Sequence, residues 1–305
     1  MRQAVWLAMA IMLLLPAGKV YSRNKSEREN NTLRIMSYNI RNGRGMDDAA
    51  NFQRTADAIN KACPDLVAVQ EIDSVTGRSG GKDVLRELAG LTLMHYVYAP
   101  AIDYDGGKYG IGMLSKEKPL SHRYLPLPGR EEARALLVVE FEKYIYCCTH
   151  LSLTEEDRML SLPIIKQVAA SANKPFFIAG DMNAHPDSEF IQQLQKDFVI
   201  LTDPKKLTFP ADKPDETLDY IATYAKDTTA FTRISTRVLD EPAASDHRPV
   251  VTDIIFVQPA AKIFRTEPYL QNPVGNGITV MWQTTVPTYS WVEYGTDKEH
   301  LQKAR

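Results

Sequence analysis

The segment from Phe176 to Asp187, FFIAGDMNAHPD, most constrains what this chain can fold into. An apolar β-type run ends at Gly180, and Asp181 and Asn183 follow two positions apart. Side chains at this spacing on an extended segment point to the same side, so a carboxylate and a carboxamide are expected to face one small volume at a strand tip. The other interpretation is an Asx-rich turn after an edge strand, because these residue types are common in turns.

The same pattern recurs along the chain. Other short β-rich or apolar runs also carry a polar side chain at or near their ends. They are YNIR at 38–41, QEID at 70–73, THL at 149–151, LDYI at 218–221 and SDH at 245–247. Rigid strands that present polar groups at their tips are a usual way to build a reactive site, so the repetition favours a shared site over isolated turns.

The order of predicted elements indicates an α/β fold. Helical periodicity predicts helices at 49–63, 82–89, 154–172 and 190–195. Strands are predicted at 33–39, 66–70, 95–99, 110–115, 135–141, 144–149, 176–179, 217–223, 233–239 and 250–256. Many strands with few intervening helices predict a four-layer α/β/β/α sandwich of two stacked, mainly antiparallel sheets.

The first 22 residues have the pattern of a secretory signal peptide. Arg2 precedes the apolar run Ala4–Leu15 and Pro16, and this run is too short to span a bilayer comfortably. We expect cleavage after Ser22, which makes the mature protein secreted or periplasmic. An uncleaved amino-terminal anchor is the alternative. No later segment approaches a transmembrane length, so no transmembrane segment is expected after signal removal.

Charge and cysteine content narrow the possible functions. Removing the positive charges of Arg2 and Lys19 changes the formal net charge from −2 to −4. A mildly acidic chain lacks the overall positive charge with which nucleic-acid binders neutralise phosphates, so a nuclease is possible but disfavoured. The cysteines Cys63, Cys147 and Cys148 have no metal-ligand spacing, and we predict that all three are buried as small hydrophobic residues.

Taken together and in order, the polar segments resemble the endonuclease/exonuclease/phosphatase family. That family includes pancreatic deoxyribonuclease, apurinic endonucleases, neutral sphingomyelinases and inositol polyphosphate phosphatases. The resemblance covers about Leu33–Val257, within a predicted catalytic domain at 30–257. It implies hydrolysis of a phosphoric ester by metal-assisted water attack, with Mg²⁺ or Mn²⁺ as the cofactor.

A metal position is predicted around Glu71. Its carboxylate is a hard oxygen ligand of the kind that Mg²⁺ and Mn²⁺ prefer, and such a metal neutralises charge on a phosphate in the transition state. The resemblance makes Glu71 the metal ligand and places Asn39 beside it, on the water of the metal or on a phosphate oxygen. Asp246 either contributes to a metal position or orients its neighbours. The alternative for Glu71 is a surface carboxylate after a buried strand.

Two residues compete for the role of general base, Asp181 and His247. The resemblance implies that Asp181 orients the attacking water and that Asn183 donates to the phosphate. His247 either takes the proton or, as an imidazolium, stabilises the phosphorane; we favour Asp181 for the water and His247 for the charge. Asp219 is expected to accept a hydrogen bond from His247 and fix its tautomer.

Two further side chains are candidates for phosphate binding. His150 resembles the histidine with which some members of the family bind phosphate or protonate the leaving oxygen, and a buried structural histidine is its alternative. Tyr109 is a candidate hydrogen-bond donor to a phosphate oxygen, and a packed aromatic is nearly as good an interpretation. His95, His122 and His185 receive no role.

The carboxyl-terminal part is predicted to be separate. A linker at 258–266 leads to residues 267–305, which resemble the start of the fibronectin-like amino-terminal domain of purple acid phosphatases. Strands are predicted at 277–284 and 289–294. This length is too short for a sandwich of about seven strands, so the segment is predicted to be an incomplete β-sandwich.

The sequence therefore predicts a secreted metal-dependent phosphoesterase acting on a small or lipid-derived substrate. An extracellular endonuclease is the alternative within the same chemistry. A surface binding or adhesion module with an inert hydrolase fold is the alternative from another class. A serine hydrolase is rejected, because GRSGG at 77–81 follows a polar segment where a nucleophile elbow requires a buried strand.

Overall fold

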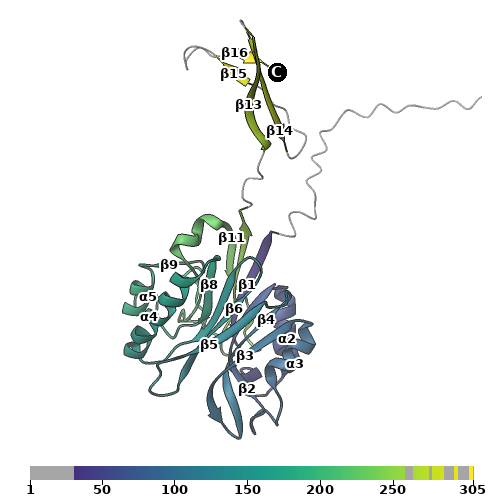
Figure 1. Cartoon of the computed structure of the whole chain (residues 1–305). Coiled ribbons are helices and arrows are strands. Elements are labelled where there is room, and N and C mark those ends of the chain that lie inside the picture. Colours follow the sequence, from purple (N-terminus) through teal and green to yellow (C-terminus); the bar gives the residue numbers. More distant parts are fainter. Residues whose placement is uncertain (1–30, 258–263, 275–276, 285–291, 295–301, 305) are drawn as a thin grey trace, which may run out of the picture.

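Two six-stranded sheets form the centre of the molecule, and helices lie on their outer sides (Figure 1). The computed structural model describes residues 31–257, 264–274, 277–284, 292–294 and 302–304. The first sheet has the order β11-β12-β1-β2-β4-β3, and the second has the order β5-β6-β7-β8-β10-β9. The predicted α/β fold with two stacked sheets is confirmed.

The first sheet combines strands from the two ends of residues 31–257. Its strands are β1 (Thr32–Asn39), β2 (Leu66–Ser74), β3 (His95–Tyr104), β4 (Gly107–Ser115), β11 (Phe231–Val238) and β12 (Val250–Phe256). Strands β1 and β2 are parallel, and every other pair in this sheet is antiparallel.

The second sheet is built from the middle of the chain. Its strands are β5 (Ser121–Leu127), β6 (Arg134–Glu140), β7 (Ile145–His150), β8 (Phe176–Asp181), β9 (Phe198–Ile200) and β10 (Asp219–Tyr224). Here β7 and β8 are the parallel pair, and the other pairs are antiparallel. Each sheet therefore contains one parallel pair inside antiparallel neighbours.

Three apolar clusters hold the layers together. The first lies between the sheets and includes Ile35, Phe177 and Ile254 from strands of both. The second packs α4 (Glu155–Ser171) and α5 (Glu189–Leu194) against the second sheet. The third packs α2 (Phe52–Ala62) and α3 (Val84–Thr92) against the first sheet. Side chains alternate along each strand, so one strand contributes to the cluster on either side of it.

The outer helices begin and end at residues with clear local causes. Asn51 and Asp83 cap α2 and α3, and each side chain accepts a hydrogen bond from the backbone N–H three residues later. Helix α4 carries three acidic residues in its first turn, where they stabilise the positive end of the helix dipole. It continues through Pro163, as the sequence predicts. The 3₁₀ helices η1 (Arg41–Gly43) and η2 (Ala225–Ala230) lie in connections.

Some expectations differ from the structure. The sequence does not predict β5, an exposed edge strand, or β9, a strand of three residues. The predicted burial of all three cysteines is wrong for Cys63, which is exposed and ends α2 in the left-handed region at φ 49°. Cys147 and Cys148 are buried on opposite faces of β7, as expected from their adjacency.

The carboxyl-terminal segment contains two short antiparallel pairs. One joins β13 (Phe264–Val274) to β14 (Gly277–Thr284), and the other joins β15 (Val292–Tyr294) to β16 (Gln302–Ala304). Strand β14 has the predicted bounds, whereas β13 was not predicted. The likeness to a fibronectin-like domain stays a prediction.

Several predicted features lie outside the described residues. They include the signal peptide at 1–22, most of the linker, and parts of 267–305. Within the described ranges, the helices are all too short or too polar to cross a lipid bilayer.

Candidate functional site

The carboxyl ends of the two parallel strand pairs carry the candidate site. In the first sheet Asn39 is aligned with Gln70, and in the second His150 is aligned with Asp181. Because parallel strands end at the same edge of a sheet, each pair presents its terminal side chains together. Asp219, at the start of antiparallel β10, lies opposite Asp181. Groups far apart in the sequence thus meet at one end of the sandwich.

Asn39 connects the two sheets at this end. Its side chain is fully buried, and Nδ2 donates to Glu71 Oε1 at 2.9 Å and to Asp181 Oδ2 at 3.1 Å. Its Oδ1 accepts from the backbone N–H of Arg41 at 3.1 Å. Both halves of the amide are therefore engaged, and the orientation of the Asn39 side chain is fixed.

Glu71 lies in an irregular part of β2. The register with β4 shifts between Val69 and Ile72, and Glu71 has a left-handed backbone with φ 58°. A bulge re-aims a side chain, and a non-glycine residue at positive φ requires support from its surroundings. Burial raises the pKa of the Glu71 carboxyl, and the hydrogen bond from Asn39 opposes that rise. The result is a half-buried carboxylate that accepts a hydrogen bond from the Asn39 side chain.

Asp181, Asp219 and His247 form a buried charged group. His247 Nδ1 lies 2.9 Å from Asp219 Oδ2, and His247 Nε2 lies 3.6 Å from Asp181 Oδ2. Burial alone would lower the pKa of His247, but the charges of Asp219 and Asp181 outweigh it and raise that pKa. Burial also raises the pKa of Asp181, more than the charge of His247 lowers it. His247 is therefore held as an imidazolium beside two carboxyl groups.

His150 approaches the same oxygen of Asp181 from another direction. Its Nε2 lies 3.5 Å from Asp181 Oδ2, and its Nδ1 lies 3.2 Å from Arg134 Nη1. Burial lowers the pKa of His150 well below its ordinary value, and the charges of Arg134 and His247 lower it further. The two histidines of the site thus differ in charge.

Three other predicted residues lie near this centre with different partners. The backbone N–H of Asn183 donates to Asp181 Oδ1 at 2.9 Å, and its Nδ2 donates to the carbonyl of Leu151 at 2.9 Å. Asp246 accepts from Ser245 Oγ and lies 3.4 Å from Arg41 Nε.

Tyr109 is buried beside Tyr104, with ring centroids 6.1 Å apart, and the Arg78 guanidinium lies 5.2 Å from its ring. Burial raises the pKa of Tyr109, so its hydroxyl stays protonated. The roles of these three residues stay predictions.

The donor groups present two possible metal positions. Ligand atoms of Asp181, Asp219 and His247 all lie within 4.8 Å of one another. A metal there would have to displace the proton that the two carboxylates stabilise on His247, which disfavours this position. The Glu71 carboxylate instead offers hard oxygen atoms at a half-buried place, which suits Mg²⁺ or Mn²⁺, and the Asn39 amide holds that carboxylate through Nδ2. The residues around Glu71 therefore fit the predicted cofactor.

Residues without a predicted role also shape the site. Ser245 Oγ donates to the Asn39 carbonyl at 2.7 Å and accepts from the backbone N–H of His247 at 3.3 Å, so it ties the last loop to β1. The Phe209 ring lies 4.8 Å from the His247 ring. Ser245 stands inside the SDH segment, which was a usable signal. The sequence around Phe209 or Arg134 carries no motif that marks either residue as part of the site; only the fold brings them to it.

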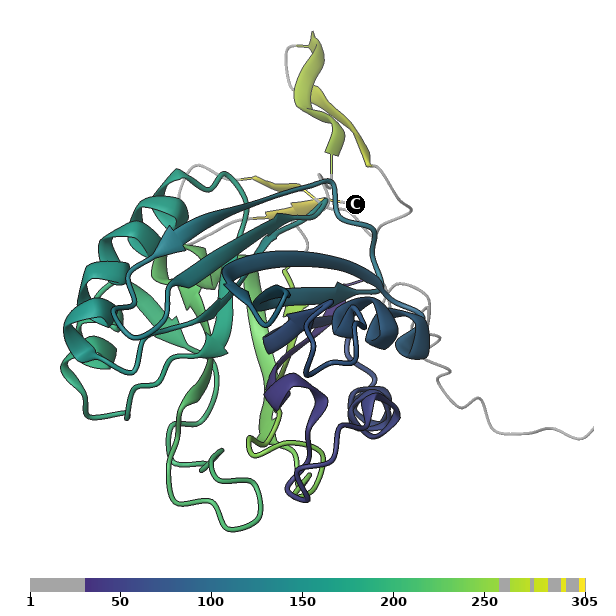
Figure 2. The ribbon, with the colours of Figure 1, turned by 90° about the horizontal axis from the view of Figure 1, so that it is seen from below.

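Loops from distant parts of the chain surround this end of the sandwich. The backbone N–H of Met46, in the loop after β1, donates to the carbonyl of Ala243, in the loop before β12, at 3.1 Å. Figure 2 shows these loops together with the loop before β10 at the lower edge of the view. Any selectivity for the group attached to a phosphate would arise among them.

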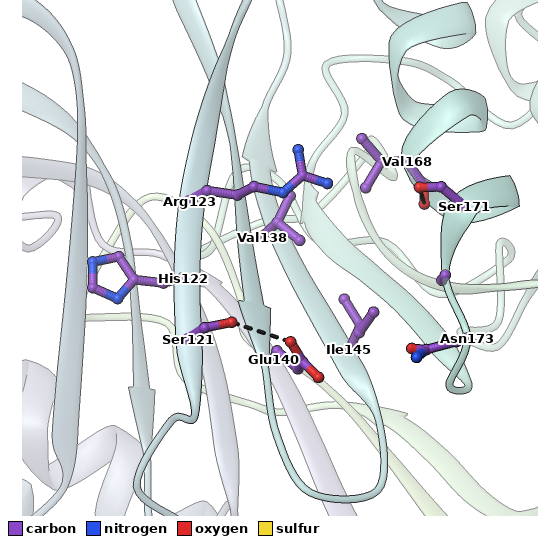
Figure 3. Close-up of a pocket in the computed structure, with 10 residues that line it drawn as sticks. Ser121, His122, Arg123, Val138, Glu140, Ile145, Val168, Ser171 and Asn173 are labelled. Atoms are coloured by element: carbon purple, nitrogen blue, oxygen red, sulfur yellow. Dashed lines mark hydrogen bonds between the residues drawn. The ribbon is translucent and has the colours of Figure 1, made fainter.

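A cavity elsewhere does not coincide with the site. It has a volume of about 160 Å³ and is lined by residues of β5, β6, β7 and the end of α4 (Figure 3). The lining residues Ile145 and Glu140 are the first residue of β7 and the last residue of β6. His150 and Arg134 lie at the opposite ends of these two strands. Ser121 donates to Glu140 across its floor at 3.1 Å. None of the predicted catalytic or metal residues lines this cavity.

Comparison with known proteins agrees with this architecture. The model of the Endonuclease/Exonuclease/phosphatase family matches residues 36–247. This chain belongs to that family. The match includes the site residues described above, from Asn39 to His247. No curated protein matches the chain significantly in a sequence search.

Solved structures share the fold of this family member at low sequence identity. A family protein from Beutenbergia cavernae is 19% identical with a TM-score of 0.60, covering 86% of this chain and 83% of its own. A mannosyl-6-phosphatase from Bacteroides thetaiotaomicron is 16% identical with a TM-score of 0.58, covering 73% and 100%. The catalytic domain of human Nocturnin with bound sulfate is 18% identical with a TM-score of 0.56, covering 75% and 94%.

Proposed function

We propose that this protein is a divalent-metal-dependent phosphoesterase that hydrolyses a phosphomonoester or phosphodiester by water attack. The observation that carries the proposal is the Asn39 amide, which donates to Glu71 on one sheet and Asp181 on the other. A candidate metal ligand and a candidate base are thereby fixed at one place. The phosphatase named among the structural relatives supports this class of reaction.

The protein groups can divide the work of the reaction. Asp181 Oδ2 is the base that accepts a proton from the attacking water, and the backbone N–H of Asn183 holds its Oδ1 in place. His247 is already protonated and held by Asp219, so it contributes charge to the phosphoryl oxygens. His150 contributes a second N–H on the other side of Asp181.

Glu71 would hold the Mg²⁺ or Mn²⁺ ion and Asn39 would hold Glu71, with Asp246 in the loop before β12. When bound, such an ion supplies Lewis acidity to a phosphoryl oxygen and offsets its growing negative charge. The pairing of Asp246 with Arg41 favours an orienting role for this carboxylate over direct ligation. Arg41 itself lies in η1, directly after Asn39 and Ile40.

For the substrate we propose a small or lipid-derived phosphoester, met outside the cytoplasm after signal removal. The mildly acidic chain supports this choice over duplex nucleic acid. An extracellular endonuclease is the competing proposal.

A matched pair of variants tests the reaction class. Hydrolysis of a bis-nitrophenyl phosphodiester is measured with Mg²⁺ or Mn²⁺, with and without chelator, for wild type, Glu71→Gln and Glu87→Gln. Glu87 is an exposed carboxylate on α3 and serves as the control. We expect chelator and Glu71→Gln each to lower the rate by roughly 10²-fold or more, since metal assistance contributes several kcal/mol. Rates that survive both treatments would contradict the proposal and leave the adhesion hypothesis.

The same preparation separates the substrate classes. Plasmid nicking at low salt is compared with phosphate or head-group release from sugar phosphates, phosphocholine and phosphoinositide esters. Turnover of a small ester without nicking is expected. Strong nicking without small-ester turnover would replace the substrate proposal with the endonuclease.

A further inference from the structure

Arg134 is a buried arginine at the edge of the site that the sequence analysis leaves without a role. It begins β6 and is 6% exposed. Its Nη1 donates to Glu132 Oε1 at 2.9 Å and faces His150 Nδ1 at 3.2 Å, and its Nη2 lies 3.5 Å from Glu131 Oε1. The two glutamates balance its charge, and the remaining contact is with a histidine ring.

The contact between Arg134 and His150 determines where the hydrogen of the histidine ring lies. A guanidinium has only donors and stays protonated in proteins. His150 Nδ1 must therefore accept, and the single hydrogen of the neutral ring lies on Nε2. That hydrogen faces Asp181 Oδ2, 3.5 Å from Nε2. The charged groups around the ring are Arg134, Asp181 and His247.

The second histidine of the site has the opposite arrangement. His247 Nδ1 lies 2.9 Å from the carboxylate of Asp219, whereas His150 Nδ1 lies 3.2 Å from the guanidinium of Arg134. Both Nε2 atoms approach Asp181 Oδ2 at nearly equal distances, 3.6 and 3.5 Å. The partner of Nδ1 therefore makes His247 a charged donor and His150 a neutral donor.

We propose that Arg134 is a positioning residue that fixes His150 in the tautomer with hydrogen on Nε2. This tautomer makes His150 a neutral hydrogen-bond donor to a phosphoryl oxygen and excludes it as the acid that protonates a leaving oxygen. The statement about the phosphoryl oxygen rests on the proposed function, whereas the tautomer does not.

Hydrogen bonds between the segment before β6 and the loop after β7 keep Arg134 next to His150. Glu131 accepts from Ser152 Oγ at 2.7 Å and from the backbone N–H of Leu153 at 2.7 Å, so the segment before β6 is tied to the loop after His150. Because both partners of the Arg134–His150 contact belong to this tied unit, their separation is constrained from both sides.

Nitrogen NMR of the full chain tests the tautomer directly. Histidine is labelled with ¹⁵N, long-range ¹H–¹⁵N correlations are recorded at neutral pH, and His150→Gln assigns the signals. We expect a protonated Nε2 and an unprotonated Nδ1 for His150 in the wild type. A hydrogen on Nδ1, or a doubly protonated ring, would overturn the proposal even if every Arg134 variant failed to fold.

Variants then show whether Arg134 is the cause. Arg134→Met removes the donor and is expected to give a mixture of His150 tautomers, whereas Arg134→Lys retains a donor and is expected to restore the Nε2–H form. Arg158→Met is the matched control. Arg158 is 7% exposed, and among the described residues its guanidinium donates only to the carbonyls of Ser152 and Leu153. An unchanged tautomer in Arg134→Met would overturn the proposal.

Activity provides an independent measure. With the phosphodiester probe we expect Arg134→Met to lower kcat roughly 10- to 100-fold, as for other residues that orient a histidine, with partial rescue in Arg134→Lys. A loss of kcat in Arg134→Met with an unchanged tautomer would assign Arg134 to direct phosphate binding and reject the positioning role. If the wild type hydrolyses nothing, the proposed function fails while the NMR result still decides the tautomer.

Discussion

The ends of the two parallel strand pairs differ in the chemistry that they present. Strand β1 ends at Asn39, and β2 carries Glu71 at its bulge, a carboxylate that suits a hard cation and accepts from the Asn39 amide. Strands β7 and β8 end with His150 and Asp181, groups that donate or accept protons. The comparison teaches that the two sheets supply different parts of one reaction, joined by the Asn39 side chain.

Both ends are supported by hydrogen bonds and by ion pairs. At the first, Ser245 Oγ donates to the Asn39 carbonyl at 2.7 Å, and Arg41 lies 3.4 Å from Asp246. At the second, Arg130 is paired to Asp157 and Arg134 to Glu132. Because the candidate metal ligand lies at the first end and the candidate acid–base groups lie at the second, we expect the first end to respond mainly to metal and the second mainly to charge and pH.

The largest expected effect tests this division at the second end. Asp181→Asn keeps the shape of the side chain but removes the proposed base, so kcat should fall roughly 10²- to 10⁴-fold, the usual range for lost general-base catalysis. The metal concentration that gives half-maximal rate should stay near the wild-type value, because Asp181 is not a proposed ligand. Steady-state kinetics over a Mg²⁺ titration measures both quantities.

Glu71→Gln is the counterpart at the first end. It should raise the metal concentration for half-maximal rate, whereas Asp181→Asn should not. If the two variants shift this concentration equally, the assignment of separate roles to the two strand pairs is wrong, and the metal lies closer to Asp181 than proposed.

A smaller effect on kcat is expected from substituting Asp219, which holds His247. Asp219→Asn replaces the carboxylate 2.9 Å from His247 Nδ1 by a neutral amide, which weakens the hold on the imidazolium. We expect kcat to fall roughly 10- to 100-fold with little change in KM. Asp253→Asn, which loses pairs with Arg34 and Arg237 on the first sheet, is the control for removing a paired carboxylate. Equal losses in both variants would indicate destabilisation in place of a lost catalytic contact.

Much of the fold could be predicted because its strands are strongly apolar and end in turn or polar residues. Strands β12 and β14 have the predicted bounds, and most other boundaries shift by a few residues. Strand β5 was missed because an edge strand needs no buried run: only Leu127 of its seven residues is buried. Cys63 was misassigned because its position depends on how α2 ends, in a left-handed residue.

The site was harder to predict than the fold. Asn39, His150 and Asp181 carry a visible signal, since each ends a strand, and the structure brings them together. The hydrogen-bond partners of these residues cannot be predicted from the sequence, because they depend on the order of the strands. Arg134 contacts His150 only because β6 and β7 pair antiparallel. The pairing of Asp246 with Arg41 could not be predicted from the sequence either, because it depends on how two loops meet in the fold.

The smallest expected effect concerns the charged support of the second end. Asp157 is 5% exposed and accepts from the Arg130 backbone N–H at 2.8 Å, while its other oxygen lies 3.1 Å from Arg130 Nη2. The side-chain bonds to Arg130 are the main cause that lowers the pKa of Asp157. This carboxylate joins the loop before β6 to the start of α4.

The sign of its pH dependence follows from the lowered pKa. The folded protein holds the Asp157 proton less tightly than the unfolded chain, so the stabilisation is fully present above the ordinary aspartate pKa of about 3.9 and is lost as pH falls through the folded value. Asp157→Asn should therefore have a lower Tm than wild type at neutral pH, and the difference should shrink below about pH 4. Glu156→Gln is the matched control, because Glu156 also faces Arg130, at 4.0 Å, but is 73% exposed; it should change stability by no more than about 0.5 kcal/mol. A Tm difference between wild type and Asp157→Asn that stays constant from pH 7 to pH 3 would show that Asp157 acts through packing and not through its charge.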